Sequence, residues 1–187
     1  VALLAVIALI PSVIQMALQY GLGLGPQAVM VVIGLTTMVS LVIYPLLIGG
    51  LLRVIHAAEN GRPTRATAIF DTFHAGGDRV PLILFGLLMT AIYLAVFLLV
   101  ISLFGKDFMA WYWQLITATQ AQQAGGAALP PDAMALPEGF GRVMGIGSLF
   151  ALFMGGVYAI GFGQVALGGR SVGAAFADGL GGTLKNV

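Results

Sequence analysis

The sequence predicts an all-α, polytopic transmembrane helical bundle, and three observations carry this prediction. Of the 187 residues, 59% are hydrophobic and only 8% are charged, and the mean hydropathy is +1.02. Soluble globular domains contain about 25% charged residues, so this chain lacks the charge to cover a surface in water. Four long apolar stretches also run through the chain, and none of them contains an Asp, Glu, Lys, Arg or His.

The apolar stretches define the elements in chain order, as spans over residues 1–18, 28–52, 81–104 and 143–167. A spanning helix needs about 20 apolar residues to cross about 30 Å of hydrocarbon, and the last three stretches reach this length. The first stretch is short by a few residues, and both ends of the chain look cut. We therefore interpret residues 1–187 as a single transmembrane domain that is a piece of a longer protein.

The positions of the basic residues predict how the spans are oriented. The loop 53–80 contains four arginines, and the tail that follows the fourth span contains one arginine and one lysine. The first connection has no charge, and the longer third connection has only Lys106 and Arg142 as basic residues. Because an excess of Lys and Arg marks cytoplasmic loops, we expect a multi-pass bacterial inner-membrane protein with the loop 53–80 and the C-terminal tail in the cytoplasm.

The loop 53–80 and the tail share a sequence pattern, which we interpret as an internal repeat. Each has Gly-Arg, then Pro-Thr or Ser, then a run of small residues with Phe and Asp, and finally glycines with a basic residue. Ser and Thr favour helix N-caps, and glycine favours helix ends. We therefore predict amphipathic helices over 63–78 and 171–184 at the inner membrane surface. Because a span follows the first copy, we expect another span after Val187.

Two segments carry a resemblance to known proteins: Pro45-Leu-Leu-Ile-Gly-Gly-Leu-Leu-Arg53 with the following Asn60-Gly-Arg-Pro63, and the tail from Ala174 to Asn186. With these motifs the chain resembles a family of six-span bacterial inner-membrane proteins. This family includes YciC-like proteins and the membrane domain found beside some glycerophosphodiester phosphodiesterases. The resemblance implies a repeat fold of six spans, four of them in this sequence, and it implies no particular activity.

Small residues recur at every fourth position of the span over 143–167. They form a ridge of Gly147, Ala151, Gly155, Ala159 and Gly163. Such a ridge lets another helix backbone approach closely. We interpret it first as a packing surface within the chain. A homo-oligomer, or a partner in a membrane complex that contacts the fourth span, is the alternative.

Aromatic residues gather in the third connection, which contains both tryptophans of the chain. Phe108, Trp111 and Tyr112 follow the spacing i, i+3 and i+4 and share one helix face, and Trp113 lies beside them. Aromatic side chains favour the boundary between membrane and water. We therefore predict an interfacial helix over 106–122 on the outer side, with an aromatic platform for a substrate as the alternative.

Asp71, His74 and Asp78 are the candidate polar cluster. Metal and acid–base sites need such groups to converge. Charged residues at a membrane edge produce similar spacings, so we expect no catalytic and no metal-binding residues. The chain has no cysteine, no Walker A motif and no histidine within a span, so we also expect no bound cofactor. No ionisable side chain lies within a span, which weighs against an ion-coupled transporter.

The expected partners are membrane lipids. Nucleic acid is excluded because the net charge of +1 provides no basic field. The favoured function is to bind or transport an apolar or lipid-like molecule, or to support envelope homeostasis. A structural or assembly subunit of a membrane complex is one alternative, and a membrane enzyme that acts on lipids is another.

Overall fold

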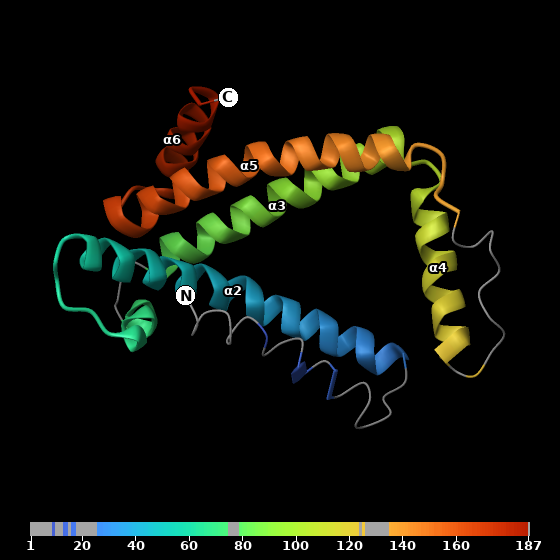
Figure 1. Ribbon diagram of the computed structural model, residues 1–187, viewed down its shortest axis with the longest axis horizontal. Helices are drawn as coiled ribbons and strands as arrows, with labels where there is room; N and C mark the ends of the chain where they lie inside the picture. The colour runs from blue at the N-terminus through green and yellow to red at the C-terminus, as the bar shows by residue number, and fades with distance from the viewer. Residues whose placement is uncertain are drawn as a thin grey trace. The chain divides into compact units, whose positions relative to one another are not determined.

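The computed structural model describes residues 9, 13–14, 16–17, 26–74, 79–123, 125 and 135–186 (Figure 1). Over these residues the chain is helical and contains no strand, which confirms the all-α prediction. The helices in chain order are α2 (Pro26–Glu59), the 3-10 helix η1 (Ala66–Phe73), α3 (Arg79–Phe104), α4 (Phe108–Gln123), α5 (Phe140–Gly168) and α6 (Val172–Leu184). The predicted span over 1–18 lies outside the described residues, apart from a few isolated positions.

Three helical segments are long and apolar enough to cross a membrane: Val31–Glu59, Arg79–Phe104 and Phe140–Gly168. They correspond to the second, third and fourth predicted spans. Large apolar side chains stay in the open on these helices; Leu149 is 70% exposed and Leu152 is 75% exposed. Such exposure costs free energy in water but not among lipid tails, which are as apolar as leucine. The chain is therefore a multi-pass membrane protein.

The helix α2 extends beyond the predicted end of the second span and ends at Glu59. We had expected Arg53 to lie in the loop 53–80, but it lies within α2. The first charged residue marks where a span leaves the apolar region, but it does not end the helix. The helix ends where Gly61 takes a φ of +69°. Its N–H and that of the next residue donate to two carbonyls of the last turn, at 3.0 and 2.9 Å, in the glycine-dependent Schellman arrangement.

The chain forms two compact units, one of Val1–Met89 with Gly156–Val187 and the other of Thr90–Gly155. In the first unit, parts of α3 and α5 pack with α2, η1 and α6. The core of this unit consists of fully or almost fully buried apolar side chains, among them Leu46, Leu47, Leu82, Phe85, Val157 and Phe162. The rings of Phe85 and Phe162 meet edge to face, with their centroids 5.9 Å apart.

The segment predicted as an amphipathic helix over 63–78 is a shorter 3-10 helix, η1, which begins after Arg65. The predicted Thr cap is wrong, because Arg65 occupies the N-cap position and makes no side-chain capping bond. The two buried residues of η1 are Ile69 and Thr72. Side chains three residues apart eclipse each other in a 3-10 helix, so this helix type turns both toward α2. The glycines expected to end the helix lie outside the described residues.

The helix α6 confirms the expected serine cap and ends at Leu184, where the predicted segment over 171–184 ends. The expectation that glycines end this helix is wrong. The Ser171 side chain accepts a hydrogen bond from the N–H of Ala174 at 3.4 Å. The helix runs on to Leu184, so the glycines at its end lie inside it. Gly182 serves packing, since a Cβ on it would lie 2.9 Å from the Ile160 side chain, whereas a Cβ on Gly181 would meet nothing within 4 Å.

The second unit contains the last part of α3, the helix α4 and the first part of α5. Its core is small and is built from Val100, Ile101 and Val143, with Phe108 packed against it. The helix α4 lies where an interfacial helix over 106–122 was predicted. At the turn between α3 and α4, the N–H of Gly105 donates to the Ile101 carbonyl oxygen at 2.8 Å.

Candidate functional site

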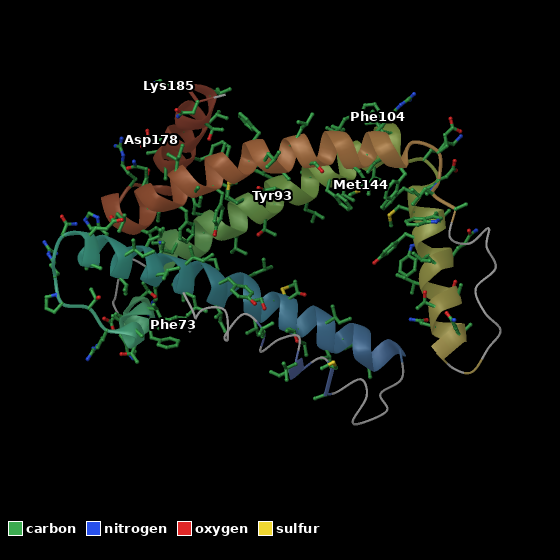
Figure 2. All side chains as sticks on the ribbon, viewed as in Figure 1. Phe73, Tyr93, Phe104, Met144, Asp178 and Lys185 are labelled. Atoms are coloured by element: carbon green, nitrogen blue, oxygen red, sulfur yellow. The ribbon has the colours of Figure 1, made fainter. Side chains whose placement is uncertain are left out.

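An apolar groove lies between α3 and α5 in the second unit. Its volume is about 270 Å³. It is lined on α3 by Tyr93, Val96, Phe97 and Val100, on α4 by Phe108, and on α5 by Val143, Met144, Gly147, Ser148, Phe150 and Ala151. Figure 2 labels one lining residue of each long helix, Tyr93 on α3 and Met144 on α5. The lining of the groove is almost entirely apolar.

The sequence builds this groove from two matching helix faces. The four lining residues of α3 follow the spacing i, i+3, i+4 and i+7, which places them on one side of the helix. On the facing side of α5, Gly147 has no side chain, and a Cβ built there would meet nothing within 4 Å. The Tyr93 hydroxyl donates to the Ala151 carbonyl oxygen at 3.3 Å. Gly147 and Ala151 of α5 therefore leave open the space that larger side chains would fill.

Aromatic rings close the end of the groove that lies nearest to α4. Phe108 lies 5.7 Å from Trp111 and 6.1 Å from Phe140, measured between ring centroids. The indole nitrogen of Trp111 is buried and has no hydrogen-bond partner among the described residues. A buried donor without a partner costs about 1–3 kcal/mol. Phe108 thus closes the groove with support from two neighbouring rings, one of which carries an unsatisfied polar atom.

A second hollow, of about 440 Å³, lies at the end of α3 and the start of α5. It contains four exposed charged side chains, two basic and two acidic: Lys106, Arg142, Asp107 and Glu138. No ion pair joins these four residues, all of which the structure describes. We call this hollow the charged pocket.

The charged pocket and the groove are consecutive along the same pair of helices. Val100 lines the groove, and Leu103, one turn later on α3, lines the charged pocket. On α5, Arg142 lines the pocket and the adjacent Val143 lines the groove. One helical turn advances about 5.4 Å, so the two hollows follow each other within about one turn along these helices.

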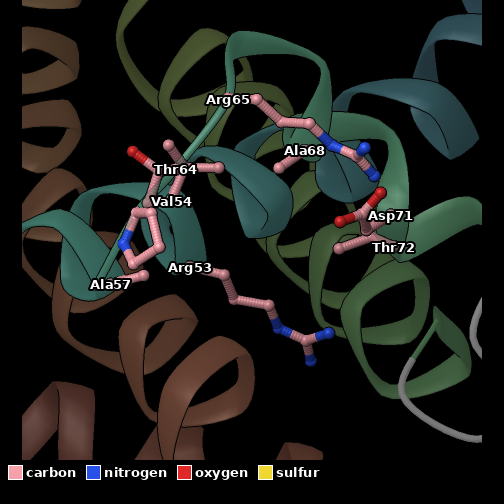
Figure 3. A pocket seen from close by; sticks show the side chains of 9 residues that line it. Arg53, Val54, Ala57, Thr64, Arg65, Ala68, Asp71 and Thr72 are labelled. Atoms are coloured by element: carbon pink, nitrogen blue, oxygen red, sulfur yellow. The ribbon is translucent and has the colours of Figure 1, made fainter.

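Another hollow, of about 500 Å³, lies in the first unit between the end of α2, the segment after it and η1 (Figure 3). Its charged lining residues are Arg53, Arg65 and Asp71. The Nε of Arg53 donates to the Ala166 carbonyl oxygen at 2.9 Å. This bond fixes Arg53 as a link between α2 and α5, so part of the polar lining has a structural role.

The two described members of the predicted polar cluster, Asp71 and His74, lie in different surroundings. Asp71 lines the hollow of the first unit. His74 does not line it, and its Nδ1 lies 3.2 Å from the Phe70 carbonyl oxygen. Asp78 lies outside the described residues. Within the described part of the chain, no three His, Asp or Glu side chains gather to hold a metal ion.

The ridge of small residues divides between two environments. Gly147 and Ala151 line the groove, whereas a Cβ on Gly155 or Gly163 would meet nothing within 4 Å, and Ala159 is exposed. Close packing within the chain is made by other glycines of α5. A Cβ on Gly156 would lie 2.9 Å from Thr183, and one on Gly161 would lie 2.8 Å from the Ala175 carbonyl oxygen. Contact of the ridge with another chain stays a prediction.

The predicted interfacial aromatics also separate into two pairs. Phe108 and Trp111 pack with Phe140, as described above, whereas Tyr112 and Trp113 are exposed. The exposed rings lie edge to face, with centroids 6.2 Å apart. Sequence spacing had placed Phe108 on a membrane-facing surface, and it gave no sign that this residue closes a groove.

No protein-family model, no curated protein and no solved structure matches this chain.

Proposed function

We propose that the protein binds a lipid-like molecule and that the apolar chain of this molecule lies in the groove between α3 and α5. The observation that carries the proposal is the succession of an apolar groove and a charged pocket along one helix pair. Phe97 and Met144 line the groove and are exposed, so a lipid chain reaches it from the side without passing through water. The ligand would be a membrane lipid, which the protein either binds permanently or transports.

The physics of the bilayer decides what such a groove needs in order to retain a ligand. An acyl chain that leaves the bilayer for the groove moves between two apolar surroundings, so the hydrophobic effect contributes little. Dispersion contacts with the groove wall contribute only where the shapes fit. Retention of the lipid therefore depends on how well its acyl chain fits the shape of the groove and on polar contacts with its headgroup. The charged pocket provides the second of these.

We further propose that the protein lies in a bacterial inner membrane as part of a six-span repeat protein. The unequal distribution of basic residues supports an orientation with the loop 53–80 in the cytoplasm. In that orientation, the charged pocket faces the outer side of the membrane. The exposed Tyr112 and Trp113 then belong to the outer connection, and aromatic side chains concentrate at the boundary between membrane and water.

Photo-crosslinking of the protein in nanodiscs tests lipid binding in the groove. The probe is a phospholipid with a diazirine on its acyl chain, and mass spectrometry locates the labelled peptides. Labelling is expected at Phe97 and Met144 in the unaltered chain. In the variant Gly147→Leu, the new side chain fills the groove, and labelling there should fall about tenfold, which corresponds to about 1.4 kcal/mol.

The matched control is Gly145→Leu on the same helix. A Cβ at Gly145 also meets nothing within 4 Å, and this residue does not line the groove. Both variants therefore add the same side chain in open space. Equal labelling of the two variants, or labelling spread evenly over all exposed faces of α3 and α5, would show that the groove holds no lipid.

A further inference from the structure

We propose that the charged pocket binds the headgroup of a zwitterionic phospholipid that carries a primary ammonium. Its phosphate faces Lys106 and Arg142, and its ammonium faces Asp107 and Glu138. The inference rests on the proposed function, because the chains of the same lipid would enter the groove. It adds the chemical class of the ligand, which the apolar groove alone does not define.

The balance of charges in the pocket is the first support. Two basic and two acidic side chains line it, and no ion pair joins them within the described structure. A headgroup with only a negative charge would meet two carboxylates that repel it. A headgroup without charge would use none of the four groups. A headgroup with one phosphate and one ammonium gives each pair of side chains a partner of opposite charge.

The helix ends provide a second support that does not depend on side chains. The first turn of α5 contributes Gly141 and Arg142 to the pocket. The first N–H groups of a helix lack partners in the helix and carry partial positive charge, which favours a phosphate. The last turn of α3 contributes Leu103 and Phe104, and the end of a helix carries partial negative charge, which favours an ammonium.

The backbone of the pocket is shaped to bring these two helix ends together. Gly139 has a φ of +79°, and a Cβ on it would collide with the Phe104 carbonyl oxygen. The carbonyl oxygen of Gly139 accepts a bond from the Val143 N–H at 2.9 Å, which starts α5 directly at the pocket. Only glycine allows this close approach, so the opposed helix ends are a built feature of the fold.

The depth of the two hollows fits one lipid molecule. On α3 the groove extends from Tyr93 to Val100, which is about 10 Å at 1.5 Å per residue. One leaflet contributes about half of the 30 Å of hydrocarbon. The groove thus holds the part of a chain nearest to the headgroup, and the charged pocket lies where the headgroup begins.

Native mass spectrometry with defined lipids tests the inference. The full chain is reconstituted with phosphatidylethanolamine and phosphatidylglycerol in equal amounts and with identical acyl chains. The unaltered protein is expected to retain the zwitterionic lipid about fivefold to tenfold over the anionic one, as two partly exposed ion pairs would give. Equal retention, or a preference for phosphatidylglycerol, would overturn the headgroup assignment.

A variant that reverses the preference keeps the test independent of folding yield. The double variant Asp107→Asn with Glu138→Gln removes both acidic groups, so the pocket keeps only its basic ones. The preference is expected to shift about tenfold toward phosphatidylglycerol. The control Glu59→Gln removes an exposed carboxylate at the end of α2, outside the pocket, and should shift nothing. A double variant that keeps the original preference would contradict the proposal.

The two proposals fail in different ways. Acyl-chain labelling in the groove, compared between Gly147→Leu and Gly145→Leu, reports only whether a chain is bound. Headgroup selectivity reports only what the charged pocket recognises. Groove labelling without selectivity would leave the lipid-binding function and remove the headgroup inference. Selectivity that Gly147→Leu does not affect would show a headgroup site that is not coupled to the groove.

Discussion

The hydroxyl of Thr72 donates a hydrogen bond to the carbonyl oxygen of Leu46 at 2.9 Å. This bond joins η1 to α2 next to Pro45, where the helix already lacks one backbone donor. Thr72 is almost fully buried, so the bond is sheltered from solvent, although the Ile69 carbonyl oxygen also lies 3.4 Å from the same hydroxyl. The short 3-10 helix is therefore attached to a specific turn of a membrane-spanning helix, and its position depends on that attachment.

Replacing Thr72 by Val is expected to loosen η1. Valine keeps the shape of the side chain and removes the hydroxyl, so the loss is that of one buried hydrogen bond, about 1 kcal/mol. Thermal unfolding in detergent should show a melting temperature lower by about 2–4 °C. The control is Thr117→Val, because the Thr117 hydroxyl is exposed and bonds only within its own helix. An equal loss in both variants would mean that the bond to α2 has no special weight.

Gly50 is the point of closest approach between α2 and η1. A Cβ there would collide with the Ile69 carbonyl oxygen, and a backbone atom cannot rotate away as a side chain can. We expect Gly50→Ala to push η1 off α2 and to speed amide hydrogen exchange in Ala66–Phe73 by more than tenfold, which is about 1.4 kcal/mol or more of lost protection.

Gly34 provides the matched control for Gly50, since it lies in α2 as well and a Cβ there meets nothing within 4 Å. Alanine is the better helix former by about 1 kcal/mol. Gly34→Ala should therefore leave exchange in η1 unchanged and slightly slow exchange in α2. If Gly50→Ala behaved in the same way, the close contact with Ile69 would not be real.

Arg53 holds the ends of α2 and α5 together through the bond from its Nε to the Ala166 carbonyl oxygen. A hydrogen bond from a charged group contributes about 1.5–3 kcal/mol. Arg53→Met keeps most of the apolar stem and removes the donor, so unfolding should become easier by about that amount. Arg62→Met is the control, because Arg62 is exposed. Denaturant titration followed by tryptophan fluorescence measures both, and a smaller effect for Arg53 than for Arg62 would refute this role.

Much of the fold could be predicted because apolar length is a local property of the sequence. The predicted span over 81–104 agrees with α3, since Arg79 precedes the apolar run and Gly105 follows it. The end of α2 was misplaced because charge reports polarity, whereas Gly61 ends the helix through its backbone conformation. The 3-10 form of η1 could not be predicted, since it depends on a contact between Thr72 and a residue on another helix.

The candidate site was harder to predict than the spans for a related reason. Sequence spacing showed that Gly147 and Ala151 share a helix face, but it could not show whether a neighbour covers that face. The structure leaves open space at Gly147, so a predicted packing residue lines a groove. In the sequence, Lys106 and Arg142 of the third connection indicate only an orientation. Their positions beside Val100 and Val143 become meaningful once the helix ends are placed together.

Adjacent glycines on α5 provide the sharpest test of which face packs within the chain. A Cβ on Gly155 would meet nothing within 4 Å, whereas one on Gly156 would lie 2.9 Å from the Thr183 side chain. Thr183 is itself buried and bonded to the Gly179 carbonyl oxygen at 2.9 Å, so it has little room to move.

Gly156→Leu is therefore expected to displace α6 and to reduce the yield of folded protein severalfold, because overpacking costs about 1–3 kcal/mol. Gly155→Leu should leave the yield unchanged. Size-exclusion chromatography after detergent extraction measures both variants, and a loss of equal size in the two would place the packing face on the ridge. A change in oligomer size for Gly155→Leu alone would instead reveal a second chain that contacts the ridge.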